Sequence, residues 1–180
     1  MVAEIRKFLL GNTPAQEADR VLATVMSTDI VDSTKQAAAM RDIGWRNLLD
    51  TSRTLVRNQR NRFRGREIET TGDGFLATFD GPARAIRCAH EIARTSKGIG
   101  ISVRTGLHTG KVELCEDEVR GIAVHMAARV SQAAGPGEVL VSNTAKDLVA
   151  GSGLTFESLG TKHFKGFVEP AAIFRANSPA

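Results

Sequence analysis

Hydrophobic and polar positions along the chain alternate between strand-like and helix-like spacing. Residues 21–28 alternate β-branched and small side chains, as a buried strand does. Apolar residues in the segment 34–62 recur at helical spacing, and Gly44 indicates a break between two helices. The apolar residues expected to share one face of these helices are Ala38, Ile43, Trp45, Leu48, Leu49, Leu55 and Val56.

Turn residues divide the rest of the chain into short elements. Segment 66–79 predicts two strands around the tight turn Thr71-Gly72-Asp73-Gly74, and Gly81-Pro82 begins a helix that reaches about Ser96. The pattern then predicts strands over 101–108, 111–114 and 138–142, helices over 121–134 and 143–149, and short strands within 156–174. This order predicts an α+β fold, in which helices cover one face of a mainly antiparallel sheet of the ferredoxin-like, split βαβ type.

The length of 180 residues suits one domain with a single core. We expect an N-terminal helix or linker over 1–20, the domain itself over 21–176, and a tail over 177–180. The first segment leaves room for an upstream regulatory domain. No apolar stretch is long enough to span a bilayer, and the run 8–10 is too short for an export signal, so a cytoplasmic location is expected.

The charge of the chain permits a nucleic-acid partner but does not favour one. The formal net charge is +4, yet aromatic residues make up only 5% of the chain and tyrosine is absent. Without basic runs interleaved with aromatics, the usual single-strand platform is missing. We interpret the arginines within 53–66 as a solvated helix face, and Cys88 and Cys115 as reduced structural residues.

Two carboxylates occupy positions that suit chemistry. Asp29 ends an apolar strand, and Asp73 lies at the tip of a hairpin. If the two strands are neighbours, both side chains reach the same edge of the sheet and suit Mg²⁺ or Mn²⁺. Two such metals stabilise the attacking and leaving oxygens of a phosphoryl displacement. From spacing alone the alternative stays open that Asp29 caps a helix and Asp73 is a turn residue.

Five short motifs in order resemble the catalytic domain of class III adenylyl and guanylyl cyclases, most closely the bacterial, mycobacterial-type members. The first and second resemble the metal motifs of that family, the third its Arg-x-Gly-x-His-x-Gly strand, the fourth its transition-state helix, and the fifth its late phosphate-binding turn. They are the segments 22–34 (LATVMSTDIVDST), 71–77 (TGDGFLA), 104–110 (RTGLHTG), 121–129 (GIAVHMAAR) and 164–166 (FKG).

The resemblance implies a role for each matching residue. Asp29, Asp73 and the carbonyl group of Ile30 would hold two divalent metals, Mg or Mn. Arg104 and Lys165 would bind the triphosphate of the nucleotide. Arg129 would stabilise charge in the transition state. His125 stands where the family has an asparagine that orients the ribose, and this departure leaves ribose orientation to a histidine donor, which also titrates near neutral pH.

The positions that read the purine also depart from the family. Glu69 replaces the lysine of adenylyl cyclases and matches guanylyl cyclases, because a carboxylate accepts from the N1–H and N2–H₂ of guanine. Glu118 matches the adenine-reading acidic position and favours ATP. The two positions therefore conflict, and Arg120 is close enough in sequence to contribute a donor.

The resemblance implies an enzyme that converts ATP to 3′,5′-cyclic AMP and pyrophosphate for intracellular signalling. GTP conversion to cyclic GMP is the first alternative, because of Glu69. A weakly active or inactive nucleotide-binding regulator is the second. Another two-metal phosphoryl-transfer enzyme and a nucleic-acid binder are further alternatives. The family's sites form between two domains, so a single chain with both residue sets implies a homodimer.

Overall fold

The computed structural model describes residues 19–115 and 118–179, so most of the expected linker 1–20 lies outside the described residues. The strands are β1 (Asp19–Ile30), β2 (Arg66–Thr71), β3 (Gly74–Phe79), β4 (Val103–Cys115), β5 (Glu118–Arg120), β6 (Val139–Ser142), β7 (Phe156–Lys162) and β8 (Ala171–Ala176). The helices are α2 (Ser33–Ala39), α3 (Asp42–Arg62), α4 (Pro82–Gly98), α5 (Ile122–Ala133) and α6 (Asn143–Asp147).

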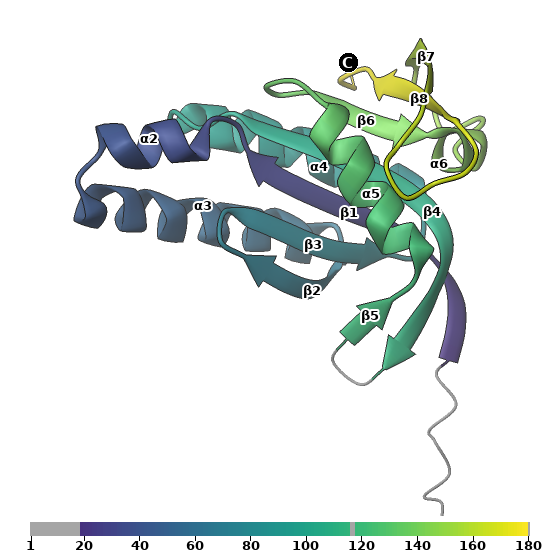
Figure 1. The fold of residues 1–180 in the computed structure, drawn as a ribbon, viewed down its shortest axis with the longest axis horizontal. Helices are drawn as coiled ribbons and strands as arrows, with labels where there is room; N and C mark the ends of the chain where they lie inside the picture. Colours follow the sequence, from purple (N-terminus) through teal and green to yellow (C-terminus); the bar gives the residue numbers. More distant parts are fainter. Residues whose placement is uncertain (1–18, 116–117, 180) are drawn as a thin grey trace, which may run out of the picture.

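One sheet organises the chain, with the strand order β2-β3-β1-β4-β6-β8-β7 and with β5 paired to β4. Among the strands that the structure describes, only the β4–β6 pair is parallel, and every other pairing is antiparallel. This confirms the expected α+β fold with a mainly antiparallel sheet (Figure 1). None of the helices in the described part of the chain has the length and apolar character needed to cross a membrane.

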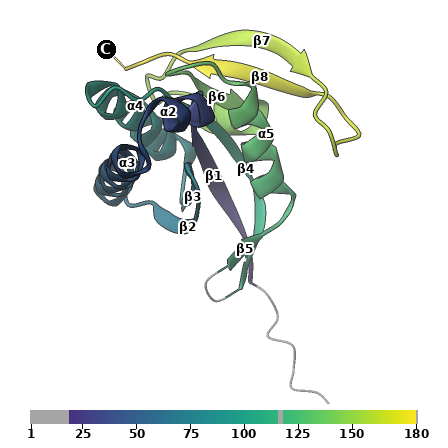
Figure 2. The same ribbon diagram turned by 60° about the vertical axis from the view of Figure 1, so that its left-hand side comes forward.

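Helices cover both faces of the sheet rather than the one face expected from sequence. The larger core cluster joins β1 residues such as Met26 and Ile30 to Val56 of α3 and Ile86 of α4. On the other face, a smaller cluster joins Val25 of β1 to α5. Figure 2 shows α3 and α4 on one side of β1 and β3, and α5 on the other. Successive β1 side chains alternate between these two layers, as strand geometry requires.

The predicted break in the first helical segment is displaced. The chain leaves helical geometry at Met40, which has φ −100° and ψ 147°, and α3 begins at Asp42, so Gly44 lies inside the first turn of α3. Ile43 was expected to share the apolar face of these helices but is 74% exposed. Trp45, Leu48 and Leu49 do pack against the core, as the periodicity predicted.

The expected turn at Thr109-Gly110 is wrong, because β4 runs unbroken through these residues. Register explains the difference: all twelve residues of β1 pair with β4, and Thr24 and Thr109 are directly opposite. The two buried threonine hydroxyls share a hydrogen bond of 2.8 Å across the strands. A Thr-Gly pair signals a turn only where no neighbouring strand satisfies its backbone groups.

Candidate active site

The end of β1 carries a cross-strand ion pair. Asp29 lies directly opposite Arg104 of β4, so the two side chains share a face of the sheet. Arg104 donates from Nε and Nη2 to Oδ2 of Asp29, at 3.1 and 2.5 Å. Both side chains are about one-third exposed, at 32% and 29%. The pair is therefore accessible to a ligand from solvent.

Asp73 reaches the same end of β1 through the β2–β3 turn. Thr28 of β1 pairs with Phe75 of β3, and continuing that antiparallel register places Gly74 opposite Asp29. Asp73 lines a small pocket together with Thr28 and Ile30. Arg53 of α3 donates a 2.6 Å hydrogen bond to the carbonyl oxygen of Gly72 and so fixes the turn.

The donor set at this strand end fits a hard divalent cation. Asp73 and Ile30 line one pocket, and continuing the register of β1 with β3 places the turn that carries Asp73 beside Asp29. Mg²⁺ is usually held by one or two carboxylates and completes its shell with water and substrate phosphate oxygens. The described residues contain no cluster of three or more histidine, cysteine or acidic side chains, the kind that holds a metal without help from substrate. The oxygen donors of Asp29, Asp73 and Ile30 would therefore need a phosphate ligand to complete a site.

A second group of predicted residues meets in a groove beside α5. His125 and Arg129 lie one turn apart on α5, and Lys165 comes from the segment between β7 and β8. These three side chains line one groove of about 380 Å³. Arg129 donates a 3.0 Å hydrogen bond to Gln132 on the same helix. Two cations and a histidine around an open groove suit a phosphorylated ligand.

The close approach of α5 to β4 positions this groove. A Cβ added to Gly106 of β4 would lie 2.0 Å from the backbone nitrogen of Ser131 and 2.5 Å from the carbonyl oxygen of Ala127. A Cβ on Gly110 would lie 3.1 Å from that of Ala123. The two glycines of the segment 104–110 therefore allow the helix to rest on the strand, which explains their spacing in structural terms.

A β-bulge decides which way Glu69 faces. The register between β2 and β3 shifts between Glu67 and Glu69, so that Glu69 pairs with Leu76. Leu76 packs in the cluster beneath α5, and directly opposite residues share a face. Glu67 faces α3 instead, where Arg57 and Arg60 donate to it at 2.9 and 3.1 Å. These contacts with Arg57 hold the pKa of the Glu67 carboxyl below its usual range.

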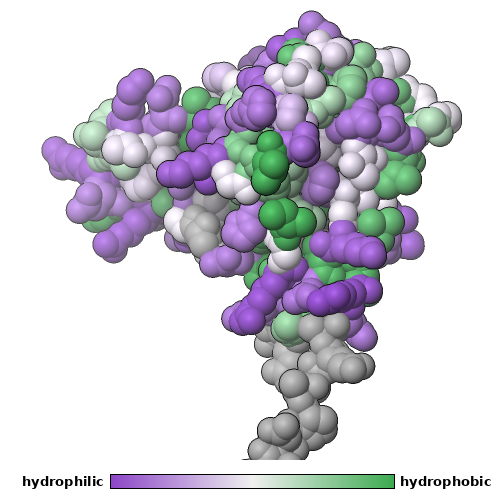
Figure 3. Space-filling view, turned by 45° about the vertical axis from the view of Figure 1, so that its right-hand side comes forward, coloured by the Kyte–Doolittle hydropathy of each residue, from purple (hydrophilic) through white to green (hydrophobic). Residues whose placement is uncertain are grey.

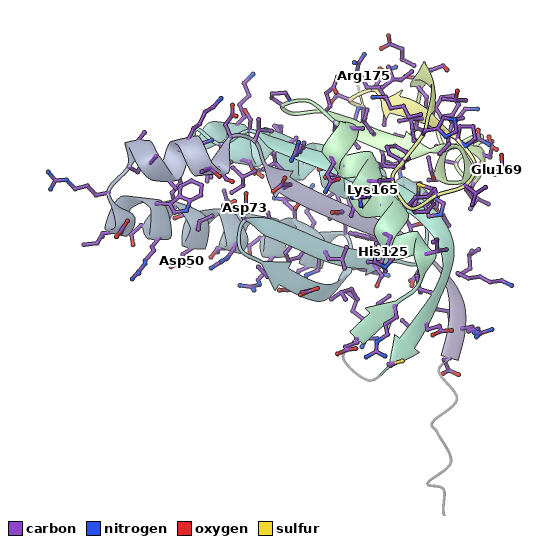
Figure 4. The ribbon with its side chains drawn as sticks, in the orientation of Figure 1. Asp50, Asp73, His125, Lys165, Glu169 and Arg175 are labelled. Atoms are coloured by element: carbon purple, nitrogen blue, oxygen red, sulfur yellow. The ribbon has the colours of Figure 1, made fainter. Side chains whose placement is uncertain are left out.

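The structure divides the predicted site residues into separate groups. Asp29, Ile30, Asp73 and Arg104 lie at one end of β1, and His125, Arg129 and Lys165 line the α5 groove. Figure 4 shows Asp73 on the β2–β3 side and His125 with Lys165 around α5. The purine-reading candidates Glu69 and Glu118 are both exposed, on β2 and β5.

One contact at β5 was not expected from the sequence. Arg120 donates from Nε to Oε2 of Glu118 at 2.8 Å, and its Nη2 also contacts that oxygen. The alternation of side chains in a strand places residues two apart on one side, and this signal was available in the sequence.

His108 and Cys88 lie in buried, packed surroundings. His108 lies on β4, where its Nδ1 is 2.7 Å from the hydroxyl oxygen of Ser142, and burial lowers its pKa. Cys88 is buried in α4, and burial raises the pKa of its thiol to about 12. Cys88 and Cys115 are both free, as expected for reduced structural residues. A thiol with so high a pKa is a poor nucleophile.

Comparisons with known proteins give one consistent result. The sequence model of a family described as "Adenylate and Guanylate cyclase catalytic domain" matches residues 13–174. The adenylyl cyclase CyaB from P. aeruginosa has a similar structure, with a TM-score of 0.85 and 19% identity over 91% of this chain and 97% of that chain. A protein titled "Adenylate/Guanylate Cyclase/Hydrolase" from Silicibacter pomeroyi has a TM-score of 0.79 and 26% identity over 91% and 99%.

Sequence relatives include proteins much longer than the matched region. An uncharacterized protein of Rhizobium meliloti is 27% identical over 92% of this chain and 18% of its own length. The receptor-type adenylate cyclase GRESAG 4.3 of Trypanosoma brucei brucei is 25% identical over 86% of this chain and 17% of its length. An uncharacterized protein of Mycobacterium tuberculosis is 32% identical over 60% and 39%. The matched region thus spans less than half the length of these relatives.

Proposed function

Because the chain belongs to the adenylate and guanylate cyclase catalytic-domain family, we propose that it converts ATP to 3′,5′-cyclic AMP and pyrophosphate. The observation that carries this proposal is the placement of the family's motif residues. Asp29, Asp73 and Arg104 lie at one strand end, and His125, Arg129 and Lys165 line one groove. The group at the end of β1 offers ligands for metals and phosphates. The group beside α5 offers cations for the negative charge that develops in the transition state.

The reaction is an in-line displacement at the α-phosphorus. The ribose 3′-oxygen loses its proton to solvent and forms a bond to the α-phosphorus, while the bond from that phosphorus to the bridging oxygen breaks and pyrophosphate leaves. Two Mg²⁺ or Mn²⁺ ions, held by Asp29, Asp73 and the Ile30 carbonyl, would supply activation of the 3′-hydroxyl and neutralisation of the triphosphate. The proposed mechanism assigns no general base to the protein, because a bound metal would lower the pKa of the 3′-hydroxyl directly.

The cationic side chains of the chain bind and orient the nucleotide. Arg104 and Lys165 donate to triphosphate oxygens, and a guanidinium does so in a two-pronged geometry that an ammonium lacks. Arg129 donates to the α-phosphate as negative charge builds there, which is worth most in the transition state. His125 takes the place of an amide donor to the ribose. A phosphate that binds Nε and Nη2 of Arg104 would displace Asp29 from these two donors.

We propose in addition that the working unit is a homodimer with its sites at the interface. The two residue groups lie at different places on one chain, one at the end of β1 and one beside α5. In a homodimer, each group of one copy would complete a site with the other group of the second copy. Apolar side chains beside the groove support an interface: Ile122 is 62% exposed, and Val168 of the β7–β8 segment is 91% exposed. Figure 3 shows exposed apolar side chains among hydrophilic ones on this side of the molecule.

GTP is a second candidate substrate, because the bulge turns Glu69 toward the α5 face of the sheet. A carboxylate at the purine edge accepts from guanine N1–H and N2–H₂ but repels adenine N1. The resulting product would be cyclic GMP. Family relatives described as adenylate cyclases, and the acidic Glu118, support ATP.

The test is a product assay on the purified chain. ATP and GTP are supplied separately with Mn²⁺ and then with Mg²⁺, and cyclic AMP, cyclic GMP and pyrophosphate are quantified over a range of protein concentrations. Cyclic product with a rate per chain that rises with protein concentration is expected for an interfacial site. Absence of cyclic product from both nucleotides at high protein concentration contradicts the proposal. Metal-dependent nucleotide binding without turnover would then indicate a regulatory domain.

A further inference from the structure

The β5 strand carries an exposed ion pair that neither packs in the core nor joins two elements. Glu118 and Arg120 are two residues apart on one strand and contact each other at 2.8 Å through Oε2 and Nε. Their side chains are 63% and 66% exposed. Exposed pairs of this kind contribute little to folding, because solvent screens both charges. Stability therefore offers no strong reason for the pair.

Arg120 has another carboxylate within reach of its strand, but that one is engaged. Glu113 of β4 lies directly opposite Arg120 in the register of the two strands. Glu113 accepts a 3.0 Å hydrogen bond from Arg20 of β1. Arg120 in turn bonds Glu118 through two of its nitrogens. The Arg120 guanidinium thus engages Glu118, one of the two acidic side chains that the family resemblance assigns to the purine.

The pair lies beside the strand that carries the other purine-reading candidate. Ile68 of β2 and Val119 of β5 pack in the same apolar cluster, which holds the two strands together. Glu69 follows Ile68, and Glu118 and Arg120 flank Val119. β2 and β5 are in contact, so Glu69 on the one strand and Glu118 with Arg120 on the other belong to neighbouring strands.

Glu118 paired with Arg120 and Glu118 alone suit different purines, because they present different hydrogen-bonding groups. A free Glu118 carboxylate offers only acceptors, which suit the 6-amino group of adenine and repel the 6-oxygen of guanine. With Arg120 on its Oε2, one of those acceptors is occupied, and the remaining guanidinium N–H groups are donors that suit the 6-oxygen. Glu69 already suits the N1–H and N2–H₂ of guanine.

We propose that Arg120 is a specificity-determining residue which, by engaging Glu118, admits GTP beside ATP to the site. The inference rests on the proposed cyclase function, because it concerns which purine that site reads. It adds Arg120 to the purine-reading residues that the family resemblance implies, on the basis of its contact with Glu118.

The experiment measures nucleotide binding rather than turnover. Isothermal titration with 3′-deoxy-ATP and 3′-deoxy-GTP in Mg²⁺ gives both affinities, since neither analogue has the 3′-hydroxyl that cyclisation consumes. Arg120→Ala is expected to raise the ATP-to-GTP affinity ratio about tenfold, the usual worth of one hydrogen bond to a charged group. Adding Glu118→Gln to Arg120→Ala is expected to reverse that gain, because the gain comes from the freed carboxylate.

The matched control is Arg84→Ala, which removes a half-buried arginine of α4 from its ion pair with Asp80, before the helix. It is expected to leave the ratio unchanged. A ratio in Arg120→Ala within twofold of the unmodified chain overturns the inference, as does failure of the unmodified chain to bind either analogue. A shifted ratio in a chain that forms no cyclic product upholds the inference and contradicts only the proposed turnover.

Discussion

Arg104 of β4 donates two hydrogen bonds to a single oxygen of Asp29, the residue directly opposite it on β1. A guanidinium and a carboxylate paired in this way each satisfy the charge of the other. The same carboxylate is the proposed metal ligand, and the same guanidinium the proposed phosphate ligand. Metal and nucleotide binding are therefore linked, because each competes for one partner of the same ion pair.

Arg104→Ala is predicted to strengthen Mn²⁺ binding in the absence of nucleotide and to weaken nucleotide binding. Removing the guanidinium frees Oδ2 of Asp29 and removes a positive charge from beside the cation. We expect a several-fold change in each affinity, measured by calorimetry. Arg94→Ala removes an arginine from a pair with Glu91 on α4 and serves as the control. Equal Mn²⁺ affinity in the unmodified and Arg104→Ala chains would refute the linkage.

Asp73→Ala is predicted to lower turnover to less than about a tenth, since loss of a metal ligand costs several kcal/mol of transition-state stabilisation. Asp29→Ala should do the same. The fold is expected to persist, because Asp73 lies in the β2–β3 turn and is only partly buried. Circular dichroism and a product assay check both points. Asp80→Ala removes a carboxylate that is 96% exposed at the other end of β3, and it should keep full activity.

Gly106→Ala is predicted to destabilise the fold by about 1–3 kcal/mol, the usual cost of overpacking. The new Cβ would meet backbone atoms of Ser131 and Ala127, which cannot move without displacing α5. Turnover should fall too, since α5 carries Arg129. Urea unfolding measures the stability, and Gly98→Ala, with open space around its Cβ, is the control. If both variants unfold at the same urea concentration, the close approach does not govern stability.

Acid should destabilise the fold in part through His108. Burial lowers its pKa in the folded state below the unfolded value of about 6.5. The unfolded chain therefore binds the proton first, and the free energy of unfolding falls as the pH drops below about 6.5. Above that pH, His108 is neutral in both the folded and the unfolded chain, so its titration no longer lowers the free energy of unfolding.

His108→Gln is expected to unfold with a smaller difference between pH 7.5 and pH 5.5 than the unmodified chain. Urea unfolding at the two pH values measures this difference. Burial lowers the pKa of His90 in the same direction, so some acid sensitivity should remain. His163→Gln changes an exposed histidine and is the control. An acid sensitivity that His108→Gln leaves intact would exclude this source.

Local signals allowed much of the fold to be predicted from sequence. Turn residues and periodicity predict the strand pair around the turn at 72–73, the helix that begins at Pro82 and the helix that ends at Ala133. The turn expected at Thr109-Gly110 was wrong because the strand that pairs with this segment, β1, lies far away in sequence. Helix coverage of both faces was missed for a similar reason, since periodicity identifies an apolar face but not the side of the sheet that it covers.

The candidate site shows the same division between local and non-local information. Its residue types were identifiable from motifs, and their grouping follows from strand pairing. The Asp29–Arg104 bond joins residues 75 positions apart, so no local pattern reports it. The bulge before Glu69 depends on how β2 pairs with β3, and the sequence of β2 alone does not reveal it.

That bulge also places two nearby acidic residues, Glu67 and Glu69, in different surroundings. Glu67 ties β2 to α3 through Arg57 and Arg60, whereas Glu69 faces away from them and is exposed. A substitution at position 69 should therefore leave the ties between β2 and α3 intact, because those ties are made by Glu67 alone of the two carboxylates. The irregularity in β2 thus makes the proposed purine-reading position separable from the contacts that hold the strand in place.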